Sequence, residues 1–283
     1  MQEFRPSGFQ VLPPIVKNIL IINGLVLMAQ TFIGNIDANP PDYITNTFAL
    51  HSWHSPLFKP WQPITYMFMH GGFTHFLFNM FAVWMFGSIL ENMWGARRFL
   101  IFYIVCGLGA AFAQLLVLHF QQISLIHDWA QLKPPHDFTV DEFKTFYIEH
   151  IRSLPIDQTG VQQVIKSWSA DPNNRSYAEM LMDFTNRVVA MELNSGATMG
   201  ASGAVFGLLV AFGYLFPNTL ISLYFFIPIK AKWFVLGYAA VELFLAFQNS
   251  ATDNVAHVAH LGGALVGFIL VYFWNKTNRR QFY

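Results

Sequence analysis

Charged side chains are scarce in this chain of 283 residues. Asp, Glu, Lys and Arg together make up 11% of it, whereas about 25% is usual in soluble globular domains. Acidic and basic residues are equal in number, 16 of each, so the formal net charge is zero. Nucleic-acid-binding domains are typically basic. The composition therefore argues against an ordinary soluble domain, and we predict no nucleic-acid partner.

Cysteine is almost absent, because Cys106 is the single one in the sequence. One cysteine cannot form a disulfide within a chain, so cysteine usage gives no indication of the redox compartment. Cys106 lies in an apolar run. We therefore interpret it as a small buried apolar residue.

Hydrophobic residues are abundant instead, at 54% of the chain. Crossing the hydrocarbon core of a bilayer takes about 20 apolar residues in a helix. Six stretches meet or nearly meet this length, at residues 15–34, 64–90, 99–119, 201–216, 232–247 and 255–274. The first ends without a small-residue cleavage site, so we expect an uncleaved span. The sequence predicts an all-α, polytopic membrane protein with six transmembrane helices in a bundle.

One long segment, residues 120–195, is polar and rich in acidic residues. Parts of it show helical periodicity, at 141–154 and 176–193. We interpret it as an extramembrane helical insertion between the third and fourth spans. Residues 1–119, with the first three spans and the first outer loop, and 196–283, with the last three spans and the C-terminal tail, would then form one catalytic domain.

The basic residues predict an orientation, because short cytoplasmic loops are enriched in Lys and Arg. With the N-terminus in the cytoplasm, nine basic residues fall on that side: Arg5, Lys17, Arg97, Arg98, Lys230, Lys232, Lys276, Arg279 and Arg280. Six spans return the C-terminus to the cytoplasm, while the insertion faces outward. We expect a multi-pass protein of a bacterial inner membrane.

Polar residues within apolar spans are costly, so they point to function. Three of the six spans carry them: His70, His75 and Asn79 in the second, Ser202 at the start of the fourth, and His257 and His260 in the sixth. In the predicted topology all of them lie near the outward ends of their spans. A shared depth in three separate helices indicates a single site.

Ser202 is the candidate nucleophile. Considered alone, a serine in the first turn of a helix is more often a helix cap. However, Gly200 and Gly203 flank it and permit other backbone segments to approach closely. A helix N-terminus also offers free N–H groups to a developing oxyanion. The motif differs from the Gly-x-Ser-x-Gly elbow, because Ala204 occupies the last glycine position.

His260 is the candidate general base, since burial favours the neutral imidazole that a base requires. A packing role is the alternative. Asp253 is seven residues earlier in the sequence, and Glu242 belongs to another predicted span, where it could pair with backbone or lysine. We therefore predict a Ser-His dyad without an acidic third member.

His75 and Asn79 are four residues apart and share one helical face. With the Ser202 N–H they could form an oxyanion hole. Hydrogen bonding between helices is the alternative role of such side chains.

Small residues offer a reason for the two catalytic candidates to meet. Gly203 and Gly207 form a small-residue face on the fourth span, and Gly263 and Gly267 form one on the sixth. Phe206 lies one turn after Ser202 and could pack on the His260 ring. The alternative for Phe206 is lipid or core packing.

A metal site is the competing use of these histidines. His257 and His260 are three residues apart, but the sequence has no His-Glu-x-x-His motif. We expect no carboxylate or thiolate nearby to complete a zinc site. The sequence therefore predicts neither a metal nor another cofactor.

The pattern as a whole resembles the rhomboid family of intramembrane serine proteases. Three segments match the family pattern: His70-Gly-Gly-Phe-Thr-His75-Phe-Leu-Phe-Asn79, Gly200-Ala-Ser202-Gly-Ala-Val-Phe206-Gly207, and Ala259-His260-Leu-Gly-Gly263 with Gly267 beyond it. Supporting matches are Trp61, Glu91, Gly95, Arg98 and Phe99. The resemblance implies six spans, an acyl-enzyme on Ser202, and an oxyanion hole of His75, Asn79 and the Ser202 N–H. It also implies single-span membrane proteins as substrates, entering past the fifth span, with no cofactor.

Three departures from the family pattern stand out. Gln62 follows Trp61 where arginine is frequent, which leaves the anchoring of the first loop open. Phe206 stands where a tyrosine is frequent. The insertion at 120–195 is unusual and could gate access to the site, bind a partner, or serve as a passive stabilising domain.

Two other functional classes compete with a protease. A non-catalytic relative would bind transmembrane helices, but both Ser202 and His260 are present. A transporter or channel would need polar residues along a path across the bilayer, whereas these gather at one depth.

Overall fold

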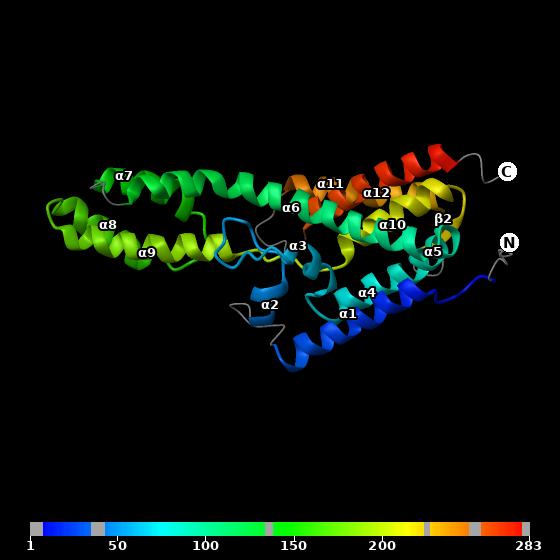
Figure 1. Cartoon of the computed structure of the whole chain (residues 1–283). Coiled ribbons are helices and arrows are strands. Elements are labelled where there is room, and N and C mark those ends of the chain that lie inside the picture. Colours follow the sequence, from blue (N-terminus) through cyan, green and yellow to red (C-terminus); the bar gives the residue numbers. More distant parts are fainter. Residues whose placement is uncertain (1–7, 35–42, 134–137, 224–226, 249–255, 279–283) are drawn as a thin grey trace. The chain divides into compact units, whose positions relative to one another are not determined.

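The computed structural model describes residues 8–34, 43–133, 138–223, 227–248 and 256–278. It is mostly helical (Figure 1). The chain divides into two compact units. The first comprises Met1–His51, Leu57–Leu116 and Gly196–Tyr283, and the second comprises Ser52–Pro56 and Val117–Ser195.

The first unit contains the apolar helices. The long ones are α1 (Pro14–Phe32), α4 (Phe73–Ala82), which continues through a π-turn at Val83–Gly87 into α5 (Ser88–Trp94), the first part of α6 (Ala96–Leu132), α10 (Ser202–Leu215), α11 (Ala231–Gln248) and α12 (His257–Asn278). The short elements are α2 (Tyr43–Phe48), α3 (Gln62–Thr65), a 3₁₀ turn (Tyr66–Phe68), and the antiparallel strands β1 (Leu220–Leu223) and β2 (Ile227–Lys230), in which Leu220 pairs with Lys230.

Among the described residues, four helices are long and apolar enough to cross a membrane. They are Pro14–Phe32, Phe73–Trp94, Ala96–Leu132 and His257–Lys276, and Ser202–Leu215 is a shorter apolar helix. The protein is therefore a multi-pass membrane protein. The four correspond to the predicted spans 1, 2, 3 and 6. A count of six stays a prediction, since α10 is short and α11 is not among the four.

The structure corrects the bounds of two predicted spans. The second was expected at 64–90, but the chain leaves the helix between Tyr66–Phe68 and Phe73. Gly72 there has a φ of +147°, which glycine adopts easily and other residues avoid. The third was expected to end at 119, but α6 continues to Leu132.

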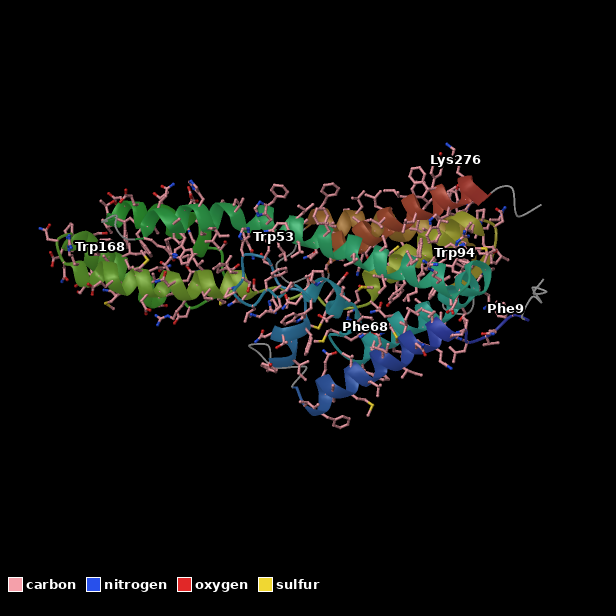
Figure 2. All side chains as sticks on the ribbon, in the orientation of Figure 1. Phe9, Trp53, Phe68, Trp94, Trp168 and Lys276 are labelled. Atoms are coloured by element: carbon pink, nitrogen blue, oxygen red, sulfur yellow. The ribbon has the colours of Figure 1, made fainter. Side chains whose placement is uncertain are left out.

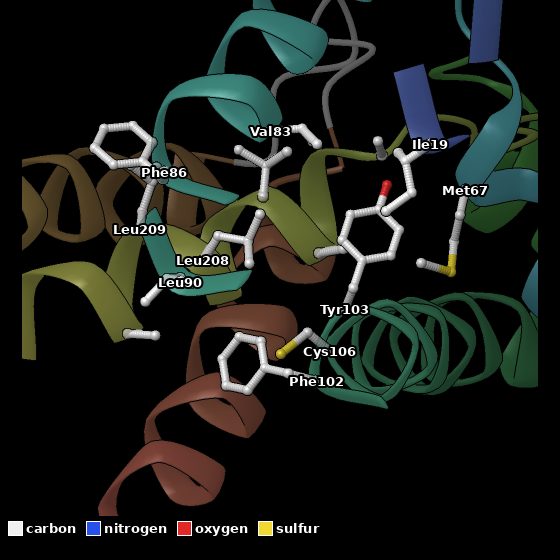
Figure 3. Close-up of a cluster of buried hydrophobic side chains, with 14 of the residues drawn as sticks. Ile19, Met67, Val83, Phe86, Leu90, Phe102, Tyr103, Cys106, Leu208 and Leu209 are labelled. Carbon is white, nitrogen blue, oxygen red and sulfur yellow. The ribbon is translucent and has the colours of Figure 1, made fainter. Parts of the chain in front are cut away.

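The core of the first unit is built mainly from side chains of α1, the 3₁₀ turn, α4 to α6 and α10. Figure 3 shows Met67, Phe102, Tyr103, Cys106 and Leu208 within it, all of them buried. Cys106 is a free buried thiol, as the sequence indicated. The N-terminus of α1 is held by the buried carboxylate of Glu91, which accepts hydrogen bonds from the Ile15 and Val16 N–H groups at 2.9 and 2.8 Å.

The second unit has a small core of its own. Its helices are α7 (Val140–Phe146), followed by a π-turn at Tyr147–Ile151, then α8 (Thr159–Ala170), α9 (Arg175–Asn194) and the last part of α6. Phe143, Trp168, Leu181 and Val189 are buried together between these helices, and Figure 2 marks Trp168. A capping box of Thr139 and Glu142 starts α7. Of the two segments predicted to be helical, 176–193 is helical throughout, whereas 141–154 is helical only as far as Ile151.

Candidate active site

Backbone hydrogen bonds fix the segment that leads to Ser202. Leu50 and Thr198 exchange two N–H···O bonds of 2.9 Å, and the Gly200 N–H donates to the Tyr66 carbonyl at 2.9 Å. The Tyr66 hydroxyl in turn donates to the Gly107 carbonyl of α6 at 2.7 Å. Ser202 is the first residue of α10, so its N–H has no partner within the helix.

Ser202 and His260 meet at hydrogen-bond distance. Ser202 Oγ lies 2.8 Å from His260 Nε2, joining the start of α10 to α12. His260 is 8% exposed. The serine hydroxyl and the imidazole therefore lie in the relation that a nucleophile and its general base require.

Glycine contacts between α10 and α12 make this meeting possible. A β-carbon on Gly263 would lie 1.9 Å from the Gly203 carbonyl oxygen, and one on Gly267 would lie 2.7 Å from the Gly207 Cα. The two backbones are thus in direct contact, as the small-residue faces predicted.

An aromatic neighbour stacks on the His260 ring. Phe206 stacks on it with centroids 4.4 Å apart and an interplanar angle of 9°. The ring of Tyr238 on α11 packs against Phe206, with ring centroids 4.8 Å apart. The expected stacking is therefore present, and a second aromatic ring supports it.

The structure contradicts the prediction that His260 has no acidic neighbour. Glu242 Oε2 on α11 lies 2.9 Å from His260 Nδ1 and 2.6 Å from His257 Nδ1. From the sequence, backbone or lysine were the possible partners of Glu242. The available signal was its position as the single acidic residue of the predicted span 232–247, because an ionisable residue within a span is usually functional.

His75 lies against Gly200, at the start of the segment that carries Ser202. A β-carbon on Gly200 would lie 2.8 Å from His75 Nε2 and 3.5 Å from Ser202 Oγ. The Gly71 N–H donates to His75 Nδ1 at 3.3 Å. With Nδ1 accepting, the proton of a neutral His75 is on Nε2, the nitrogen on the Gly200 side. Gly200 has a φ of +131° and no room for a side chain.

His70 supports His75 from the turn before α4. Its backbone N–H and carbonyl form two hydrogen bonds of 3.0 Å with the side-chain amide of Gln30 on α1. Its ring is buried and meets the His75 ring edge-on, with centroids 5.2 Å apart. Gln30 was not among the predicted site residues, because its role depends on how α1 packs.

Asn79 lies one turn after His75 on α4 and is 5% exposed. Its amide nitrogen has no hydrogen-bond partner among the described residues. A buried donor without a partner is costly, which makes Asn79 available to an oxygen of a bound substrate.

Gln62 anchors the first loop through its side-chain amide. It is fully buried, donates to the Leu57 carbonyl at 2.9 Å, and accepts from the His51 N–H at 3.2 Å. The neighbouring Trp61 indole donates to the Thr47 carbonyl at 3.0 Å. The question that the sequence left open is therefore answered, because a buried amide and an indole hold this loop.

The same cluster must also be tested as a metal site, because Glu242, His257 and His260 each offer a ligand atom. The expectation that no carboxylate lies near these histidines was wrong. However, ligands at 2.0–2.1 Å from a tetrahedral zinc lie about 3.3 Å apart. The observed 2.6 and 2.9 Å are hydrogen-bond distances.

Comparison with known proteins identifies the family. The model of the Rhomboid domain matches residues 58–126 and 175–276, which is more than half of the chain. The chain belongs to the rhomboid family. Ser202, His260, His75 and Asn79 all lie within the matched residues, whereas most of the second unit falls in the gap between them.

Individual relatives of this rhomboid protein align over different lengths. Rhomboid protein 1, mitochondrial, of Saccharomyces cerevisiae is 35% identical over 86 residues, 30% of this chain and 25% of the relative. Rhomboid protease GluP of Bacillus subtilis is 36% identical over 53 residues, 19% of this chain and 10% of the relative. An uncharacterised mitochondrial rhomboid protein of Schizosaccharomyces pombe is 24% identical over 98% of this chain and 68% of the relative. The first of these alignments thus spans a quarter of that relative.

These relatives do not support the predicted bacterial inner membrane. The names of the Saccharomyces, Schizosaccharomyces and Arabidopsis thaliana relatives place those proteins in mitochondria. The Bacillus relatives are bacterial. A membrane location is shown, and its compartment is not.

Proposed function

We propose that this rhomboid protein is an intramembrane serine endopeptidase, with Ser202 as nucleophile and His260 as general base. The observation that carries the proposal is the 2.8 Å contact of Ser202 Oγ with Nε2 of the buried His260. Membership of a family with named proteases among its relatives supports the reaction class.

The chemistry would proceed in two steps. Ser202 Oγ attacks the carbonyl carbon of the scissile peptide bond while its proton moves to His260 Nε2. The tetrahedral intermediate collapses as the leaving amine takes that proton, which leaves an acyl ester on Ser202. Water then attacks the ester, with His260 again accepting and returning a proton.

The negative oxygen of the tetrahedral intermediate needs donors. We assign this role to the Ser202 N–H, His75 and Asn79. The free N–H at the start of α10, the His75 ring beside Gly200 and the unpartnered Asn79 amide support the assignment. Donors already fixed in place stabilise charge that appears only in the transition state.

The proposed substrates are single-span membrane proteins in a lipid bilayer, cut within or beside their transmembrane segment. In the proposed topology, six spans leave both termini in the cytoplasm, and the site opens toward the opposite side. Residues 120–195 form an outward-facing insertion in this arrangement, between a catalytic domain built from 1–119 and 196–283. No cofactor takes part in the proposed reaction.

A serine-directed fluorophosphonate and a model transmembrane substrate in liposomes test this function. We expect labelling of the full chain, no labelling of Ser202→Ala, and no cleavage by Ser202→Ala or His260→Ala. Ser88→Ala, which removes another largely buried hydroxyl of the same unit, is the matched control and should keep both activities. Cleavage by Ser202→Ala at the wild-type rate would reject the mechanism. Substrate binding by the unmodified chain without labelling or cleavage would instead indicate a non-catalytic helix-binding protein.

A further inference from the structure

One carboxylate oxygen connects α11 to two histidines of α12. Glu242 Oε2 lies 2.6 Å from His257 Nδ1 and 2.9 Å from His260 Nδ1. Glu242 is 4% exposed, and both histidines are 8% exposed. Burying a carboxylate is unfavourable unless hydrogen bonds compensate for the water that it loses. In this chain the imidazoles of His257 and His260 provide these hydrogen bonds to Glu242.

Helix geometry explains why both histidines reach the same atom. His257 and His260 are three residues apart, so their side chains leave one face of α12. The α11 helix packs on this face, as Figure 1 shows for the two neighbouring helices. Because an ionised carboxylate is an acceptor only, each Nδ1 must carry the proton in the bond it makes with Glu242.

This assignment decides the state of the other ring nitrogen. A neutral His260 with its proton on Nδ1 has an unprotonated Nε2, which is the atom 2.8 Å from Ser202 Oγ. The stacked Phe206 fixes the plane of the ring, but stacking does not select which nitrogen holds the proton. Glu242 supplies that selection.

We propose that Glu242 is a positioning residue for the reaction, the third member of a Ser202–His260–Glu242 triad, with His257 holding the carboxylate in place. The inference rests on the proposed protease function. When Ser202 loses its proton to His260 Nε2, the ring becomes an imidazolium whose Nδ1–H still donates to Glu242. The carboxylate stays ionised and stabilises that positive charge until the leaving amine takes the proton.

Glu242→Gln tests this role with little change in shape. In other serine proteases the corresponding exchange of acid for amide lowers kcat by about 10⁴-fold. We expect a fall in kcat on the order of 10² to 10⁴ with a small change in KM. Glu242→Asp, which keeps the charge, should recover part of the loss. Glu91→Gln is the matched control, because Glu91 is an equally buried carboxylate of the same unit outside the site. It should keep the wild-type kcat.

The pH profile separates this role from a packing role. Among the residues that the structure describes, the ionisable groups around His260 are His75 on α4, Tyr238 and Glu242 on α11, and His257 on its own helix. Glu242 is the one that favours the imidazolium. In Glu242→Gln, which lacks this charge, the fall of kcat/KM at acidic pH should therefore occur about 1 pH unit or more lower than in the unmodified chain. Glu242→Gln with wild-type kcat and an unshifted acidic fall of kcat/KM would overturn the proposal, while labelling of Ser202 would still uphold the protease function.

Two further measurements complete the test. In ¹⁵N-histidine-labelled full chain in lipid vesicles, His260 should show a protonated Nδ1 and a bare Nε2, and this state should be lost in Glu242→Gln. This readout does not depend on catalysis. A bare Nδ1 in the unmodified chain would overturn the proposal. So would loss of activity on chelation that zinc restores, because the three side chains would then be metal ligands.

Discussion

Gly263 of α12 contacts the backbone of Gly203 of α10 so closely that a β-carbon on Gly263 would lie 1.9 Å from the Gly203 carbonyl oxygen. A backbone oxygen cannot move aside as a flexible side chain can. The relative position of α10 and α12, and with it the distance from Ser202 to His260, therefore depends on the absence of a single methyl group.

Gly263→Ala should thus force the two helices apart. We expect loss of cleavage together with a lower melting temperature in detergent, because overpacking a close contact typically costs 1–3 kcal/mol or more. Gly237→Ala on α11 is the control, since among the described residues a β-carbon there would meet no atom of another element within 4 Å. It should melt at or above the wild-type temperature, because alanine favours helix over glycine. Equal melting of the two variants would contradict the packing argument.

Residue spacing was sufficient to predict much of this site. The glycine pairs four residues apart on the fourth and sixth spans indicated which helices approach, and this placed Ser202, Phe206 and His260 together. The apolar runs located all the long helices of the first unit. These features are local, since each depends on periodicity within a single helix.

Features that depend on the rotation of one helix against another were missed. Glu242 meets His260 only because α11 turns that face toward α12, and no spacing within either helix encodes this. Gln30 reaches the His70 backbone for the same kind of reason. The break before Phe73 was predictable in principle from Gly71 and Gly72, but the apolar run around it favoured a continuous span.

Asn79→Ala should lower kcat more than it raises KM. The Asn79 amide nitrogen has no hydrogen-bond partner among the described residues. In the proposed mechanism it donates to the negative oxygen, which forms only in the transition state. Loss of one such donor costs about 10²- to 10³-fold in kcat. Steady-state kinetics with a transmembrane substrate measure this. An unchanged kcat would return Asn79 to a packing role between helices.

Glu91 should stabilise the first unit without affecting the chemistry. It accepts the Ile15 and Val16 N–H groups in the first turn of α1, where a carboxylate also interacts favourably with the helix dipole. Glu91→Ala leaves both donors without this partner and should cost about 1–3 kcal/mol. Thermal melting in detergent should show the loss, and Glu179→Ala, at an exposed position of α9, should not. A Glu91→Ala protein that melts like wild type would refute the capping role.

The second unit should lose stability in mild acid because of His54. His54 Nε2 lies 2.8 Å from His119 Nδ1, and the two rings stack with centroids 5.1 Å apart. Burial, and secondly the neighbouring His119, hold the pKa of His54 below its usual 6.5. The unfolded chain therefore takes up a proton at a higher pH than the folded one, so stability falls as the pH drops through 6.5 and levels off once folded His54 is protonated.

Hydrogen exchange measures this effect within the second unit. Amide protection in α8 and α9, corrected for intrinsic rates, should decrease between pH 7 and pH 5.5 in the unmodified chain. His54→Gln should reduce that decrease, because the folded and unfolded states then bind protons alike at this position. His127→Gln, which replaces an exposed histidine of the same unit, should leave the decrease as it is. If His54→Gln and the unmodified chain lost protection equally, the stacked pair would not be the source of the acid sensitivity.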